Sequence, residues 1–170
     1  MAVEAVVGFA GVIIGALATS LVTIYRERLA ARQDVERRDQ QYERERLGAR
    51  NAFQRESILD LQAAASELMK AAYAELDRLL DTYSATTQWS TRQWETPTAV
   101  GWSEALLALQ TARARVFDEE LRSIADSLRI SAANAIWADS PASAKQYSDD
   151  VEPTFDRLNA RVSAVLPTLY

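Results

Sequence analysis

The hydrophobic and polar positions divide this chain into three successive patterns. Residues 3–25, VEAVVGFAGVIIGALATSLVTIY, are almost continuously apolar. Residues 26–56 are dominated by charged side chains, whereas apolar positions in residues 57–170 recur every three or four residues. No stretch shows the strict alternation of a half-buried strand. The pattern predicts an all-α protein with an N-terminal anchor (1–25), a charged helical stalk (26–56) and a helical bundle (57–170).

The apolar segment is long enough to cross a membrane. About 20 helical residues span the ~30 Å hydrocarbon core, and a helix satisfies its own backbone polar groups there. We therefore expect a single transmembrane helix. Cleavage as a signal peptide stays open as an alternative. Ala16-Leu17-Ala18 resembles a cleavage site, although no basic residue precedes the apolar run.

Arginines fix the expected orientation of this helix. Arg26, Arg28 and Arg32 follow it directly, and no Lys or Arg precedes it. Basic residues flanking a span stay on the cytoplasmic side. We expect a single-pass protein of the cell membrane with its N-terminus outside and its bundle in the cytoplasm.

Small residues line one face of the predicted span, at Gly8, Gly11, Gly15 and Ala18. Such residues let two helix backbones approach closely. This pattern predicts a helix-pairing face and a possible homo-oligomer within the bilayer. The alternative is that glycine and alanine are simply common in membrane spans.

The stalk has few apolar residues. Val35, Tyr42 and Ala49 keep a seven-residue spacing, but Arg38 and Glu45 occupy the companion positions of a coiled-coil seam. We expect a solvated single helix; pairing with another copy or a partner helix is the alternative.

The bundle region predicts three amphipathic helices, over about 53–83, 102–137 and 142–165, packed as an antiparallel three-helix bundle. Thr96-Pro97 and Ser140-Pro141 have the cap-and-proline pattern of helix starts. Pro153 lies inside the last apolar stripe and predicts a kink or break near residues 149–152.

Residues 85–100 interrupt the helices with a polar loop that contains Trp89, Arg92 and Trp94. Trp and Arg are frequent anchors of protein interfaces, so these three residues are a candidate surface for an unknown protein partner. The alternative is that the tryptophans fold back and cap the open end of the bundle.

Composition limits the possible chemistry. The chain has no cysteine and no histidine. It therefore lacks the residues of the commonest nucleophilic systems and of most zinc and haem sites. We expect no catalytic site, no cofactor and no metal, and we interpret Asp118-Glu119-Glu120 as a solvated helix face. Residues 57–170 hold sixteen acidic and ten basic side chains, which argues against nucleic-acid binding. The strong preference for Arg over Lys suggests a bacterial, GC-rich genome.

Together these features favour a non-enzymatic, membrane-anchored interaction or scaffold protein. The alternative is a membrane-acting effector of the phage lysis or defence type, which would oligomerise through its transmembrane helix.

Overall fold

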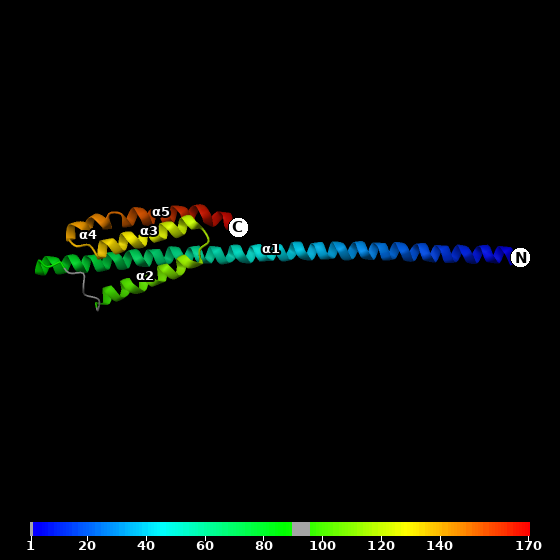
Figure 1. Cartoon of the computed structure of the whole chain (residues 1–170), viewed down its shortest axis with the longest axis horizontal. Helices are drawn as coiled ribbons and strands as arrows, with labels where there is room; N and C mark the ends of the chain where they lie inside the picture. Colours follow the sequence, from blue (N-terminus) through cyan, green and yellow to red (C-terminus); the bar gives the residue numbers. More distant parts are fainter. Residues whose placement is uncertain (1, 90–95) are drawn as a thin grey trace. The chain divides into compact units, whose positions relative to one another are not determined.

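The computed structural model describes the backbone of residues 2–89 and 96–170, and the side chains of residues 34, 36–89 and 96–170. All regular structure in these residues is helical, and they contain no strand (Figure 1). This confirms the all-α prediction. The chain divides into two compact parts, Met1–Ala49 and Arg50–Tyr170, and each is considered by itself.

The N-terminal part belongs to a long helix, α1, which covers Ala2–Thr86. Asp34 and all side chains from Glu36 to Arg50 are exposed, as expected of the solvated stalk. Within the described residues, no helix combines the length and the apolar character needed to cross a membrane. The side chains of the predicted span, residues 3–25, lie outside the described set, so the span remains a prediction.

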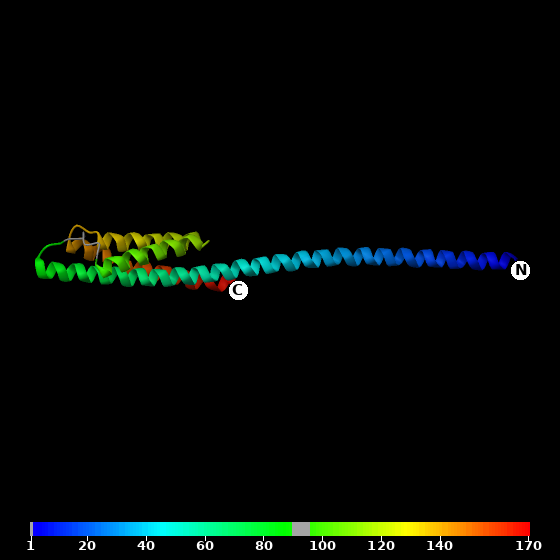
Figure 2. The ribbon, with the colours of Figure 1, turned by 90° about the horizontal axis from the view of Figure 1, so that it is seen from below.

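The C-terminal part is a bundle in which helices run side by side with alternating direction (Figures 1 and 2). Residues 50–86 of α1 are followed by α2 (Pro97–Arg115), α3 (Glu119–Ile136), α4 (Pro141–Ser148) and α5 (Val151–Val165). A short 3₁₀ helix, η1 (Leu166–Leu169), ends the chain. One end of the bundle holds the α1–α2 loop, and the other, called the turn end below, holds the α2–α3 connection.

The predicted apolar stripe of α1 is the central element of the core. Its members are almost fully buried: Ile58, Leu61, Ala65, Leu68, Ala72, Leu76 and Leu79. The other helices close around it with Trp102 and Leu109 from α2, Leu121 and Leu128 from α3, and Leu158 from α5.

The prediction of three bundle helices was wrong, because the expected helix over 102–137 is two helices. The chain leaves α2 at Val116, which is extended (φ −87°, ψ 132°), and α3 begins after Asp118. Val116 is nevertheless buried, so the apolar periodicity continues across the break and conceals it. With α4 and α5 as one interrupted helical run, the described residues of the bundle form four helical segments rather than three.

The buried amide of Gln54 holds this α2–α3 turn. Its Nε2 donates to the Arg115 carbonyl (3.0 Å), and its Oε1 accepts from the Phe117 N–H (2.8 Å). The last carbonyls of a helix have no hydrogen-bond partner within that helix. Gln54, on the neighbouring helix α1, provides a donor for one of them, the Arg115 carbonyl. The same amide satisfies both a donor and an acceptor of the turn, so the turn is tied to α1.

Other local predictions are confirmed. Thr96 and Ser140 cap α2 and α4 by accepting from the N–H groups of Ala99 and Ser143, each at 3.2 Å. The last helical run breaks between α4 and α5 at residues 149–150, and Pro153 lies in the first turn of α5. There its missing N–H costs no hydrogen bond.

We predict that Gln54→Ala lowers the free energy of unfolding by about 2 kcal/mol, since the Phe117 N–H and the Arg115 carbonyl lose their partner. Gln110→Ala, an exposed change on α2, is the control and should alter it by less than about 0.5 kcal/mol. All four tryptophans fall within residues 57–170 of the sequence, so urea unfolding of the full chain in mild detergent, followed by tryptophan fluorescence, reports on this part of the chain alone. Equal effects of the two substitutions would contradict the role of the amide.

Candidate functional site

Trp89, one of the predicted partner residues, closes the loop end of the bundle. Its ring packs against the cluster of Leu76, Ala138 and Ala144, and its Nε1 donates to the Ala138 carbonyl at 2.7 Å. Tyr83 meets it edge-on, with ring centroids 6.2 Å apart. With these contacts, Trp89 covers the loop end of the bundle core. This corresponds to the alternative given above, in which a loop tryptophan folds back and caps the bundle.

The other predicted site residues are not placed. Arg92 and Trp94 lie outside the described residues, and at Gly8, Gly11, Gly15 and Ala18 the structure describes the backbone alone. Both the partner surface and the helix-pairing face stay predictions.

A buried carboxylate joins α1 to the start of α2. Glu75 is 4% exposed and accepts two hydrogen bonds from Arg78, at 2.6 and 3.0 Å. Burial alone raises the pKa of Glu75, but the bonds from Arg78 and from the Thr98 hydroxyl outweigh it and leave the pKa below its ordinary value. The first turn of α2 has no acidic residue, so Glu75 places a negative charge near that helix N-terminus.

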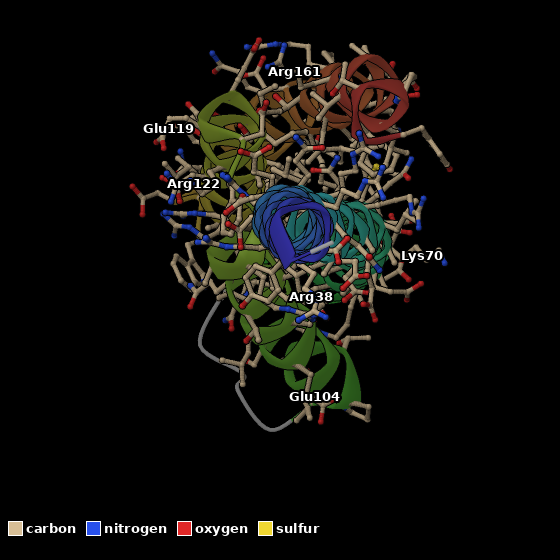
Figure 3. All side chains as sticks on the ribbon, turned by 90° about the vertical axis from the view of Figure 1, so that its right-hand side faces the viewer. Arg38, Lys70, Glu104, Glu119, Arg122 and Arg161 are labelled. Atoms are coloured by element: carbon tan, nitrogen blue, oxygen red, sulfur yellow. The ribbon has the colours of Figure 1, made fainter. Side chains whose placement is uncertain are left out.

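The acidic run Asp118-Glu119-Glu120 has structural partners, and it marks the start of α3. Asp118 is the N-cap and accepts from the Leu121 N–H at 2.8 Å. Arg161 of α5 bonds both carboxylate oxygens of Asp118 and lies 2.9 Å from Glu120. Glu119 pairs with Arg122 on the same helix (Figure 3). The interpretation of this run as a solvated helix face therefore missed two features. Asp118 caps α3, and it forms an ion pair with Arg161 of α5.

Arg161 stabilises the charged form of Asp118. Its hydrogen bonds, aided by the Leu121 N–H, outweigh burial and hold the pKa of Asp118 below its ordinary value. The pair ties α5 to the α2–α3 turn, which Gln54 holds from α1. Three elements of the bundle therefore meet at the turn end.

An open groove of about 570 Å³ lies between α2 and α3. Its lining charges are Arg113, Glu119, Arg122 and Asp126. Arg113 binds Asp126 at 2.6 Å, and Arg122 binds Glu119, so the groove carries no net charge. One atom, Arg122 Nε, is buried without a hydrogen-bond partner. Since that nitrogen is shielded from solvent, it is not available to a ligand in the groove.

Two exposed phenylalanines form the other feature of the turn end. The rings of Phe53, on α1, and Phe117, in the turn, have centroids 6.2 Å apart. Arg50 lies over the Phe117 ring and Arg115 over the Phe53 ring, each 5.4 Å from the centroid. This aromatic–arginine cluster was not recognised from the sequence, because the apolar periodicity concealed the turn that exposes Phe117.

The described residues contain no group of three or more acidic side chains placed to hold a metal ion. No protein family, curated protein or solved structure matches the chain in the comparisons with known proteins. The functional argument therefore depends on the chain's own residues.

We predict that the Asp118–Arg161 pair contributes stability that depends on pH. Asn caps a helix about as well as Asp, so Asp118→Asn isolates the charge; it should cost about 1–2 kcal/mol at pH 7. A depressed carboxyl pKa adds stability that is present above the unfolded value, near 3.8, and is lost as pH falls through the lower folded value. The difference between wild type and Asp118→Asn should therefore shrink as the pH falls from about 5 towards about 1, the range over which a lowered Asp pKa acts.

The measurement is urea unfolding at several pH values, followed by tryptophan fluorescence. Glu67→Gln serves as the control, because Glu67 and Lys70 form an exposed pair within α1, and Figure 3 shows Lys70 on the side opposite Glu119. It should change stability by less than about 1 kcal/mol at any pH. A pH-independent effect of Asp118→Asn would show that the carboxylate charge is not what stabilises the turn.

Proposed function

We propose that this protein is a non-enzymatic, single-pass membrane protein that presents a helical bundle on the cytoplasmic side of the cell membrane for interaction with other proteins. The observation that carries the proposal is the order of its parts. An apolar segment, residues 3–25, is followed by arginines and a charged helix, and then by a separately folded bundle.

The apolar segment supports the membrane anchor. Its backbone is helical, as a span requires, and its length matches the hydrocarbon core. The arginines that follow support a cytoplasmic bundle, because basic residues resist transfer across the membrane. The small-residue face at Gly8, Gly11, Gly15 and Ala18 would let two anchors pair.

The arrangement of charges in the bundle supports interaction rather than catalysis. Its most enclosed acid, Glu75, is bound by Arg78 and Thr98, and the carboxylates of the α2–α3 groove are bound by arginines. A general acid or base works best with a pKa near the operating pH, and the bonds from Arg78 and Thr98 hold the pKa of Glu75 below its ordinary value. Arginines and aromatics are exposed instead, which is the composition of protein interfaces.

A membrane-acting effector is the second candidate, and the small-residue face of the predicted span favours it. In that case clustering of spans would disrupt the bilayer, and the bundle would control the clustering. The two proposals share the anchor and differ in which part carries the activity.

We predict that Ile13→Arg with Ile14→Arg releases the protein from the membrane fraction, since each arginine at the centre of a span costs about 2.5–3.5 kcal/mol. Ile130→Arg, at an exposed position of α3, is the matched control and should leave the protein membrane-bound. Vesicle flotation after alkaline washing measures the difference.

Because the chain has no cysteine, single-cysteine variants measure its orientation. A membrane-impermeant maleimide should label Ala2→Cys in intact cells, and label Ser127→Cys only after the membrane is opened. The anchor would be refuted by wild-type protein that fails to float, and the orientation by the reverse labelling pattern.

A further inference from the structure

The two phenylalanines at the turn end are exposed although the core beneath them is complete. Phe53 is 42% exposed and Phe117 is 55% exposed. Ile58, Val116 and Leu121, their buried neighbours along the chain, are at most 1% exposed. The phenyl rings therefore add little to the packing of the bundle. Two adjacent exposed rings from distant parts of the chain form a small apolar surface that faces solvent.

Positive charge surrounds this apolar surface. Arg50 lies over the Phe117 ring, and it has no ion pair among the described residues. Arg115 lies over the Phe53 ring and also contacts Asp60 at 2.8 Å, with both side chains more than 40% exposed. Such an exposed pair exchanges readily with other carboxylates, because it is worth little in water.

The acids of the turn itself are already bound. Asp118 and Glu120 contact Arg161, and Glu119 contacts Arg122. At the start of the bundle part of α1, Glu56 is an acid with no ion pair among the described residues. It is exposed and follows Arg55 in the chain. The acids of the turn therefore do not neutralise Arg50 and Arg115, the two cations that flank the phenylalanine pair.

The surface is also held in place before any partner arrives. Gln54 bonds the Arg115 carbonyl and the Phe117 N–H, and Asp118 is fixed by Arg161. A surface already ordered loses little conformational entropy on binding. Gln54 already hydrogen-bonds these two backbone groups, so a partner strand cannot pair with them. A partner must therefore be recognised through side chains.

We propose that Phe53 and Phe117, flanked by Arg50 and Arg115, dock an acidic amphipathic helix of a partner protein. Apolar residues of that helix cover the two rings, and its carboxylates pair with the two guanidinium groups. This inference rests on the proposed interaction function and adds its surface and the chemistry of its partner.

Charge favours this occupant over two others. The bundle as a whole is acidic, with sixteen acidic and ten basic side chains in residues 57–170, which opposes an anionic lipid surface. A compact partner helix feels mainly the local arginines, because screening acts within about 8–10 Å. A second copy docked ring to ring would bring like charges of Arg50 and Arg115 together, which is unfavourable.

The test uses the full chain in nanodiscs of uncharged phosphatidylcholine and two fluorescent helical peptides. One peptide carries a leucine stripe flanked by glutamates, and the other has glutamine at every glutamate position. Fluorescence anisotropy should show saturable binding of the acidic peptide and binding at least about tenfold weaker for the glutamine peptide. Phe117→Ser and Arg50→Gln should each weaken binding of the acidic peptide about tenfold or more.

Matched controls separate the surface from general effects. Leu107→Ser removes an apolar side chain that is 65% exposed on α2, and Lys70→Gln removes an exposed cation elsewhere on the bundle. Both should bind the acidic peptide as wild type does, and unchanged tryptophan fluorescence should show that every variant is folded.

The proposal is overturned if wild type does not bind the acidic peptide, if both peptides bind equally, or if Phe117→Ser binds normally. Phe117-dependent recruitment to phosphatidylserine vesicles in place of peptide binding would identify a lipid surface instead. Phe117-dependent dimerisation would identify a second copy. Incorporation of the chain into nanodiscs is scored separately, so failure of the anchor and failure of the docking surface give different results.

Discussion

The apolar stripe of α1 is the constraint on which the folded part of this protein depends. Ile58, Leu61, Leu68 and Leu79 lie on one helical face and are at most 2% exposed. Burying each such side chain contributes about 1.5–3 kcal/mol to the stability of the folded state. An isolated helix in water leaves these side chains exposed and lacks this contribution. Since α2, α3 and α5 bury their own stripes in the same core, α1 decides where each of them lies. The charged residues before position 50 have no comparable stripe, and the two parts of the helix therefore have different roles.

Polar contacts define the two ends of the core. At the turn end, Gln54 and the Asp118–Arg161 pair connect α1, the α2–α3 turn and α5. At the loop end, Trp89 reaches the Ala138 carbonyl, and Thr87, with φ at 56°, ends α1 in the left-handed region. A β-branched residue rarely adopts that conformation, and here the Thr87 N–H donates to the Tyr83 carbonyl at 2.7 Å. The apolar faces alone would allow the helices to shift along one another. The polar contacts at the two ends of the core fix a single register between them.

Periodicity identified most of the fold, and capping residues located the starts of α2 and α4. The exception was the break at residues 116–118, where buried Val116 continued the apolar pattern and concealed the turn. Asp118 followed by two glutamates was a readable start signal, because acids favour the first turn of a helix. Gln54 and Glu75 fall on the buried face of α1, and a polar residue within an apolar stripe predicts a partner. Their partners, Arg115, Phe117 and Thr98, depend on tertiary packing that no local pattern specifies.

We propose that one chain combines a lipid-embedded helix, a solvated helical stalk and a packed bundle. Amide hydrogen exchange of the full protein in nanodiscs tests all three parts at once. We expect slow exchange in residues 3–25 and 58–79 and fast exchange in residues 36–47, because exposed single helices open readily. Fast exchange in residues 3–25, equal to that of the stalk, would contradict the membrane anchor. Slow exchange across residues 36–47 would contradict a solvated stalk and indicate that it is packed against another helix.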